Sequence, residues 1–328
     1  DVTAWHSRGG VWPSSNWLTD IRPAPRGTGG RTLIDWITEH PQFERAKIGV
    51  AGLDGSYLIH VRAVEGGLNW QSLDMLKREF PQANFVSATP VLGPARWRKS
   101  AEEIEFLRKG TEIAEKTMQA VVEYARAGAS EREVFAEMLF ANADADGSFT
   151  PMIGWVSGPL GNPYHRLEQP TFRKLAAGDI LALEIEGRYG GYVAQIDQTF
   201  SVGPAPADLK EGFKLACDSF DRAHEALRPG ITVGELADAA DLSGLGGRAK
   251  ARLTMHGRGT GDDGPPWYGV PPAEVRDIVI EEGCCLILKP GASVDGKPEY
   301  GRWGDSVAVR PNGAERLGTR PQQLYELL

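Results

Sequence analysis

The chain has 328 residues, of which 41% are hydrophobic and 24% are charged, and its formal net charge is -8. Such a length can hold two domains with separate cores, while scattered Lys and Arg residues argue against a surface for nucleic acid or anionic membranes. The three cysteines have neither zinc spacing nor an even disulfide count, and no apolar run reaches the roughly 20 residues of a membrane-spanning helix. We therefore expect a cytoplasmic protein that binds neither nucleic acid nor membrane.

Residues 1–95 predict a small α/β domain. Apolar residues at helical spacing predict one helix after residue 32 and another near residue 75. A short strand is expected after each helix, at residues 47–50 and 85–86. The dipeptide Gly93-Pro94 then breaks the chain, which places the domain boundary at about residue 95.

Residues 96–328 begin with strong helix-start signals. A Ser or Thr followed three residues later by Glu can form a capping box, in which each side chain bonds the backbone amide of the other residue. This pattern precedes two predicted helices between residues 100 and 145, and it returns roughly a hundred residues later. The recurrence predicts an internal duplication with two sheets side by side and a site between them. The pairs are Ser100 with Glu103, Ser130 with Glu133, and Thr232 with Glu235.

Five sequence blocks resemble the pita-bread (M24-like) family of methionine aminopeptidase, aminopeptidase P, prolidase and creatinase over about 230 residues. The N-terminal segments 15–19 and 47–50 resemble the family as well, but at an unusually short interval, so we expect a short or incomplete first domain. The resemblance implies an α/β (α+β) fold, with a small α/β N-terminal domain at 1–95 and a duplicated pita-bread domain at 96–328. The blocks lie at 98–104, 158–165, 178–183, 256–261 and 289–291.

The positions of the family's metal ligands are altered in this chain. Metal-binding members carry Asp, Asp, His, Glu and Glu where this sequence has Glu184, Gln195, His256, Lys289 and Gly304. Two divalent cations need several carboxylates to balance their charge, whereas these five side chains sum to about zero without a metal. A cation is repelled by a like charge 4 Å away by about 4 kcal/mol at an effective dielectric of 20. We therefore expect no metal and no cofactor, with Lys289 paired to Glu184 in the vacated position.

Candidate catalytic residues follow from the likeness to creatinase, which is the family's precedent for catalysis without metal. The family's loop histidine and a carboxylate two residues after the second ligand position correspond to His165 and Asp197. A histidine titrates near neutral pH, so the resemblance implies His165 as general acid/base. It also implies His256 as a second proton carrier or oxyanion partner, and Asp197 with Glu184 as anchors.

Candidate substrate-binding residues depart from creatinase. Lys289 and Trp303 stand where creatinase has acidic residues, which makes creatine an improbable substrate. Lys289 with Arg258 suits a substrate carboxylate instead, and several aromatic residues suggest an aromatic-lined pocket. The predicted substrate-binding set is Lys289, Gln195, Trp303, Tyr192 and Arg258, with Trp267 and Tyr268 as aromatic neighbours.

The function predicted from this pattern is a metal-independent, creatinase-like hydrolase. It would cleave a C–N or related bond in a small polar metabolite, either carboxylated or aromatic, with histidine as the acid/base. Three alternatives stay open: an Xaa-Pro aminopeptidase-like metallopeptidase, a lyase or other non-hydrolytic enzyme, and a non-catalytic pita-bread module that binds a partner. The expected partners are a small-molecule substrate and, because dimers are common in the family, a second copy of the chain.

Overall fold

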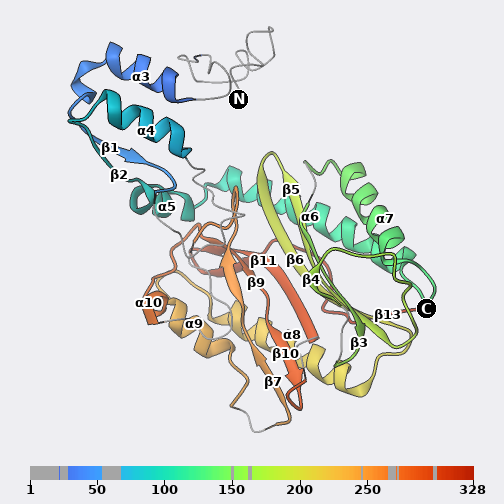
Figure 1. The fold of residues 1–328 in the computed structure, drawn as a ribbon. Helices are drawn as coiled ribbons and strands as arrows, with labels where there is room; N and C mark the ends of the chain where they lie inside the picture. Colours follow the sequence, from blue (N-terminus) through green and yellow to red (C-terminus); the bar gives the residue numbers. More distant parts are fainter. Residues whose placement is uncertain are drawn as a thin grey trace. The chain divides into compact units, whose positions relative to one another are not determined.

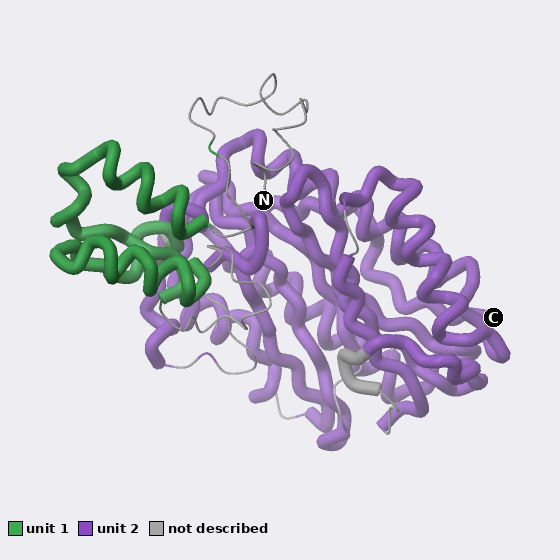
Figure 2. Tube along the Cα trace, turned by 45° about the horizontal axis from the view of Figure 1, so that its top comes forward, with its two compact units in different colours: residues 1–93 green, residues 94–328 purple. Residues whose placement is uncertain are grey.

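The computed structural model describes residues 22, 29–53, 68–148, 151–161, 165–244, 247–264, 271, 273–297 and 301–328, without the side chains of residues 89, 90, 94 and 165–168. The chain divides into two compact units, residues 1–93 and residues 94–328, which are coloured separately in Figure 2. Each unit has its own secondary structure and core, so the two are described one after the other.

The first unit combines two helices with a parallel pair of short strands (Figure 1). Asn69 caps the second helix by accepting a 2.8 Å hydrogen bond from the Ser72 amide. The strands lie where the sequence predicts them, and they pair Ile48 with Phe85. The elements are α3 (Gly29–Glu39), η2 (Pro41–Phe43), β1 (Lys47–Val50), α4 (Trp70–Glu79) and β2 (Asn84–Ser87). Helix α5 (Thr89–Trp97) follows and runs through Gly93-Pro94, so the predicted break of the chain at this dipeptide is wrong, although the two units divide there.

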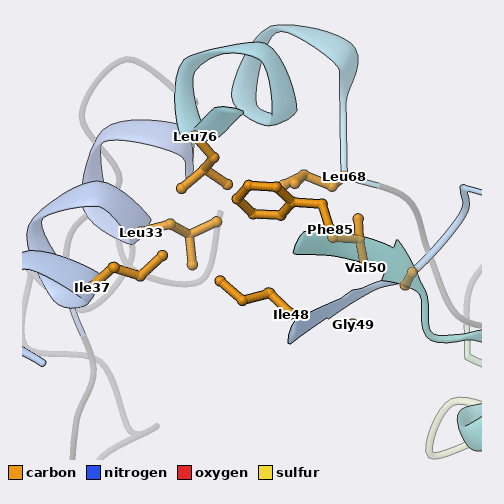
Figure 3. Close-up of a pocket in the computed structure, with 9 residues that line it drawn as sticks. Leu33, Ile37, Ile48, Gly49, Val50, Leu68, Leu76 and Phe85 are labelled. Carbon is orange, nitrogen blue, oxygen red and sulfur yellow. The ribbon is translucent and has the colours of Figure 1, made fainter. Parts of the chain in front are cut away.

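An apolar cavity of about 340 Å³ lies between the helices and the strand pair of this unit (Figure 3). Its described lining has no ionisable side chain, so it offers no group for acid/base chemistry. The lining residues are Leu33, Ile37, Ile48, Gly49, Val50, Ala51, Leu68, Leu76 and Phe85.

The second unit opens with helices whose predicted caps are confirmed. The Ser100 amide donates to Glu103 Oε2 at 2.7 Å, and the Glu103 amide donates to Ser100 Oγ at 3.2 Å. The capping boxes at Ser130 and Thr232 are formed as well. The helices are α6 (Ala101–Tyr124), α7 (Glu131–Asp144), α8 (Ala207–Ala226), α9 (Val233–Ala240) and α10 (Ala273–Arg276).

The described strands of this unit form an eleven-stranded sheet. Its main path runs β4-β3-β5-β6-β11-β10-β7, with β12 and β9 also pairing with β11, β8 with β9, and β13 with β6. The strands are β3 (Ile153–Pro159), β4 (His165–Glu168), β5 (Asp179–Tyr189), β6 (Tyr192–Val202), β7 (Ala249–Arg252), β8 (Met255–Gly257), β9 (Cys285–Leu288), β10 (Gly291–Val294), β11 (Gly301–Arg310), β12 (Gly313–Arg316) and β13 (Tyr325–Leu327).

The same order of elements occurs twice in the second unit. The helix pair α6–α7 precedes β3 to β6, and the pair α8–α9 precedes β7 to β11. Helix α6 packs on β5 and β6, whereas α8 packs on β7, β10 and β11 (Figure 1). This repeated order agrees with the recurring caps in the sequence. The prediction of two sheets side by side is wrong, because the described strands of both halves join in one eleven-stranded sheet through the pairing of β6 with β11.

Two apolar cores flank the junction of the two halves. One contains Trp155 and Phe200 beneath α6 and α7, and the other contains Phe220 and Trp303 beneath α8 and α9. Between them β6 meets β11 in a short antiparallel register, in which Trp303 pairs with Gln198 and Gly304 with Asp197. The polar residues of the candidate site lie along this junction.

Candidate functional site

Strand register brings the altered ligand positions together. In the β5–β6 pair, Glu184 lies opposite Asp197 and Glu186 lies opposite Gln195, so these side chains share one face of the sheet. Arg302 comes from β11, and Lys289 directly follows β9. We call Glu184, Gln195, Asp197, Lys289 and Arg302 the strand cluster.

Glu184 is the centre of the strand cluster. Its Oε2 lies 2.9 Å from Lys289 Nζ, and its Oε1 lies 2.8 Å from Arg302 Nη2. Gln195 donates to Glu184 Oε2 at 3.3 Å and accepts from Lys289 Nζ at 3.4 Å. Burial raises the pKa of the Glu184 carboxyl, but Lys289 and Arg302 outweigh burial and hold that pKa well below its usual range. The pairing of Lys289 with Glu184 that the sequence predicts is present.

Asp197 lies beside this pair in a different electrostatic state. Its Oδ2 is 3.0 Å from Arg302 Nη2, yet within the described part of the chain neither carboxylate oxygen has a hydrogen bond of good geometry. Complete burial raises the pKa of Asp197 to about 6, with the charge of Glu184 adding to the rise and that of Arg302 opposing it. Asp197 therefore changes its charge close to neutral pH.

His256 in β8 is buried and neutral. Its Nδ1 lies 3.2 Å from Asp262 Oδ1 and 3.2 Å from the Gly257 carbonyl oxygen. Burial and, to a smaller extent, the nearby charge of Lys289 lower the pKa of His256 to about 4, against the opposing effect of Asp262. With Nδ1 held by these acceptors, Nε2 is the remaining hydrogen-bonding atom of a neutral imidazole.

Arg258 lies among internal partners. Its guanidinium contacts Asp262 at 2.5 Å and Glu186 at 3.1 Å, and its Nε donates to the Val193 carbonyl at 3.1 Å. We call Glu186, Arg258 and Asp262 the loop cluster. The predicted role of Arg258 in binding a substrate carboxylate stays a prediction, and in this structure the side chain joins the loop after β8 to β5 and β6.

The two aromatic candidates within the described residues, Trp303 and Tyr192, lie apart and do not line a common pocket. Trp303 is fully buried, with its ring 4.6 Å from that of Phe220, and it belongs to the core under α8. Tyr192 donates from its hydroxyl to Glu103 at 2.8 Å, on the face of β6 opposite Gln195. Trp267 and Tyr268 fall outside the described residues.

His165, the predicted acid/base, is described only by its backbone. It begins β4 and pairs with Ser157 of β3. Its side chain falls outside the described part of the chain, so its proposed catalytic role stays a prediction.

Two cations of the site are absent from the predicted set. Arg302 contacts both carboxylates of the strand cluster, and Arg320 donates to the backbone carbonyl of Asp197 at 3.1 Å. Arg302 stands directly before Trp303 in the sequence block 301–305, and this position is a signal that could have pointed to Arg302. Nothing in the sequence around Arg320 indicates that it reaches the site, because it lies in the C-terminal segment after β12.

The fold is that of the pita-bread aminopeptidases and prolidases, which confirms the predicted fold class. The X-Pro aminopeptidase structure from Thermotoga maritima MSB8 superposes with a TM-score of 0.73 at 18% identity, over 98% of this chain and 84% of that one. The Xaa-Pro dipeptidase structure from Bacillus anthracis also gives a TM-score of 0.73, at 22% identity over 92% and 79% of the two chains.

The chain belongs to metallopeptidase family M24, whose model matches residues 105–311. It is 27% identical to an Xaa-Pro dipeptidase of Pyrococcus furiosus over 271 residues, 80% of this chain and 74% of the relative. It is 31% identical to a probable dipeptidase, PepE, of Mycobacterium tuberculosis over 251 residues, 73% of this chain and 63% of the relative. The chain therefore spans less than two thirds of the mycobacterial relative.

These relatives overturn the predicted main function. A metal-independent, creatinase-like hydrolase of a small metabolite is the wrong conclusion, because the similar proteins are Xaa-Pro dipeptidases, a prolidase and an X-Pro aminopeptidase. Four of the five ligand positions differ from those of the metallopeptidases, but the similarity of the whole chain outweighs these four differences. The peptidase alternative is the better supported one.

None of the helices within the described part of the chain has both the length and the apolar character of a membrane span.

The metals that the family implies do not fit the described residues. No group of three or more His, Cys, Asp or Glu side chains able to hold a metal ion occurs among them. Both Glu184 oxygens already face cations. Gly304, at the last ligand position, has no room for a side chain, since an added Cβ would lie 2.7 Å from the Leu288 carbonyl oxygen and 2.7 Å from Lys289 Cβ. The close approach of β11 to Lys289 therefore excludes a glutamate there unless the backbone moves.

Proposed function

We propose that this protein is a hydrolase of the prolidase type that acts on the C–N bond of a short peptide. The observation that carries the proposal is 31% identity to a probable dipeptidase over 73% of the chain. The fold, shared with X-Pro aminopeptidase and Xaa-Pro dipeptidase structures, supports the same class. In this proposal residues 96–328 contain the site and residues 1–95 form the accompanying domain.

We further propose that the ligand positions are degenerate, with protein cations where the family has metals. The support is geometric: Lys289 and Arg302 each lie within 3 Å of a Glu184 oxygen, at 2.9 and 2.8 Å. An ammonium or guanidinium 4 Å from a further cation costs about 4 kcal/mol at an effective dielectric of 20, so a metal at Glu184 would have to displace both side chains. The family's metals supply Lewis acidity and activate water. Lys289 and Arg302 take neither of these roles in the proposal.

The chain's own residues offer two proton-carrying groups, Asp197 in the strand cluster and His256 close to Lys289. Asp197, with its pKa raised to about 6 by burial, can hold a proton at mildly acidic pH. His256 is neutral above about pH 4, because burial and Lys289 disfavour the imidazolium. The neutral imidazole can donate a hydrogen bond to a peptide group or accept one from it. Its low pKa makes it a weak base at pH 7.

A second candidate function is peptide binding without turnover. The contacts of Glu184 favour it, since a carboxylate held by two cations and an amide has little freedom to activate water. In that case the strand cluster would stabilise the fold, and a peptide would bind without being cleaved.

One experiment separates the candidates. The purified full chain is incubated with Xaa-Pro and other dipeptides after chelation, and again after addition of Mn²⁺, Co²⁺ or Zn²⁺, while product formation and calorimetric binding are measured. Cleavage in either condition supports the hydrolase. Cleavage that requires metal refutes the degenerate ligand set, and cleavage unaffected by chelation supports it. Binding with no cleavage favours the second candidate. If dipeptides are neither bound nor cleaved, both candidates are refuted.

A further inference from the structure

The junction of β6 and β11 is short for a pairing that has to hold the site. Its register consists of Trp303 opposite Gln198 and Gly304 opposite Asp197. The neighbouring β5–β6 pair, in contrast, is continuous from Ile180 to Tyr189. Asp197 on β6 and Arg302 on β11 nevertheless meet at 3.0 Å across this junction. Side chains add to the strand register on both sides of this junction, where Ser306 bonds the Gln195 backbone at 2.8 and 3.0 Å and Thr199 accepts the Arg302 amide at 3.0 Å.

Arg320 bonds both strands at this point. Its Nη2 donates to the carbonyl oxygens of Asp197, at 3.1 Å, and of Gly304, and these two residues are register partners. Its Nη1 donates to Gln198 Oε1 at 2.7 Å. The planar guanidinium thus satisfies acceptors on β6 and β11 at once, and its fixed fork geometry differs from that of the compact ammonium of a lysine.

The Trp303 ring and helix α6 hold Arg320 in place, although its buried Nε has no hydrogen-bond partner among the described residues. It lies over the Trp303 ring, with its Cζ 4.4 Å from the ring centroid, and the residue is 5% exposed. Its backbone is fixed from α6, because Glu115 accepts the Arg320 amide at 2.9 Å and the Thr319 amide at 2.7 Å. Gly318 permits this approach, since a Cβ there would lie 2.6 Å from Glu115 Oε1.

We propose that Arg320 is a positioning residue that sets the contact between Asp197 and Arg302. The C-terminal segment, anchored on Glu115, delivers a guanidinium between β6 and β11 and fixes the spacing of the strands on which those two residues lie. The proposal rests on the proposed function only where it concerns what the site is used for. The positioning itself belongs to the free protein, and its test needs no substrate.

The test uses the NMR signals of the Arg302 side chain in the full chain. In the wild type, the ion pairs of the Arg302 guanidinium with Glu184 and Asp197 are expected to make its hydrogen exchange slow. Arg320→Ala is expected to speed that exchange by about tenfold or more, as loss of a charged hydrogen bond predicts. Millimolar guanidinium ion should restore slow exchange by filling the vacated space. Arg320→Lys, which keeps the charge, should remain as impaired as the alanine variant.

Arg316→Ala is the matched control. Arg316 comes from the same segment, lies 4.9 Å from the Trp303 ring centroid and pairs with Asp305 at 2.9 Å. It donates to the Arg320 carbonyl oxygen at 2.6 Å, but to neither Asp197 nor Gly304. Arg316→Ala should lose stability and speed Arg302 exchange much less than Arg320→Ala does, because the Arg320 guanidinium remains. Unchanged exchange in the Arg320 variants, or an equal change in the control, overturns the proposal. If Arg320→Ala does not fold, Arg320→Lys decides, because it keeps the charge and most of the buried stem.

Discussion

The strand cluster and the loop cluster are two buried groups of charges in the same unit, and they differ in how completely they are satisfied. In the loop cluster, Arg258 reaches both carboxylates and a backbone carbonyl. In the strand cluster, Asp197 has an ion contact but no well-formed hydrogen bond within the described residues. A satisfied cluster fixes structure, whereas a buried carboxylate that lacks hydrogen bonds is a group still able to exchange a proton.

The largest effect is expected from Lys289→Met. Removing the ammonium leaves Glu184 buried with Arg302 as its remaining charged partner among the contacts described, which should lower the free energy of unfolding by about 3–5 kcal/mol. Urea denaturation measures the loss. Adding Glu184→Gln to this variant should recover much of it, since the uncompensated charge is then gone. A loss below about 1 kcal/mol would show that the pair is not the electrostatic centre of the strand cluster.

Arg258→Met tests the loop cluster in the same way. Two carboxylates, Glu186 and Asp262, lose a buried partner, and the free energy of unfolding should fall by about 3 kcal/mol. If this cluster is purely structural, dipeptide binding at a temperature where the variant is folded should match the wild type. Weaker binding by the folded variant would instead give Arg258 the substrate role that the sequence predicts.

Asp197→Asn tests the unsatisfied carboxylate through pH. The folded pKa of Asp197 is about 6, above the ordinary value of 3.8, so the proton binds more tightly in the folded state. Its contribution to stability is therefore full below about pH 3.8 and is lost as the pH rises through 6. As the pH rises through this range, the free energy of unfolding of Asp197→Asn should therefore increase relative to that of the wild type, by up to about 3 kcal/mol.

The quantity to follow is the difference in free energy of unfolding between Asp197→Asn and the wild type at each pH, because a second buried group titrates in the same range. His256, with its pKa lowered from 6.5 to about 4, contributes stability that is lost as the pH falls through the same window. The exposed carboxylate Asp208, whose pKa Lys297 and Arg248 lower, serves as control, because its replacement by Asn should give no such gain. A pH-independent difference for Asp197→Asn would mean that this carboxyl does not titrate near neutral pH.

The smallest effect on ligand binding is expected from Gly304→Glu, which restores the family's last ligand type. The new Cβ meets the backbone of Leu288 and Lys289, so overpacking should lower the free energy of unfolding by about 3 kcal/mol, the upper end of the usual range. Calorimetric titration with Mn²⁺ or Zn²⁺ should show no gain in binding, even when Lys289→Glu is added. Stoichiometric metal binding by that double variant would show that the ligand set is recoverable.

Several features of this protein follow from the sequence by itself. The capping boxes at Ser100, Ser130 and Thr232 are local, so residues three apart suffice to predict them. The ordered sequence blocks predict the pita-bread fold, and charge balance predicts the pairing of Lys289 with Glu184. The dimer and the catalytic role of His165 stay predictions. The substrate class was predicted wrongly, because the altered ligand positions were weighed above the similarity of the whole chain.

The tertiary structure decided which distant side chains meet. Arg302 reaches the strand cluster because the register of β11 brings it beside Asp197, and Arg320 reaches the same junction from a segment more than a hundred residues away. Trp303 lies in the apolar core and Arg258 pairs with Asp262 inside the protein, although both types of side chain are also suited to binding a substrate. Residue type fixes what a side chain can do, while strand register and loop path fix which partners it meets. Those contacts depend on residues too far apart in sequence for any local pattern to encode.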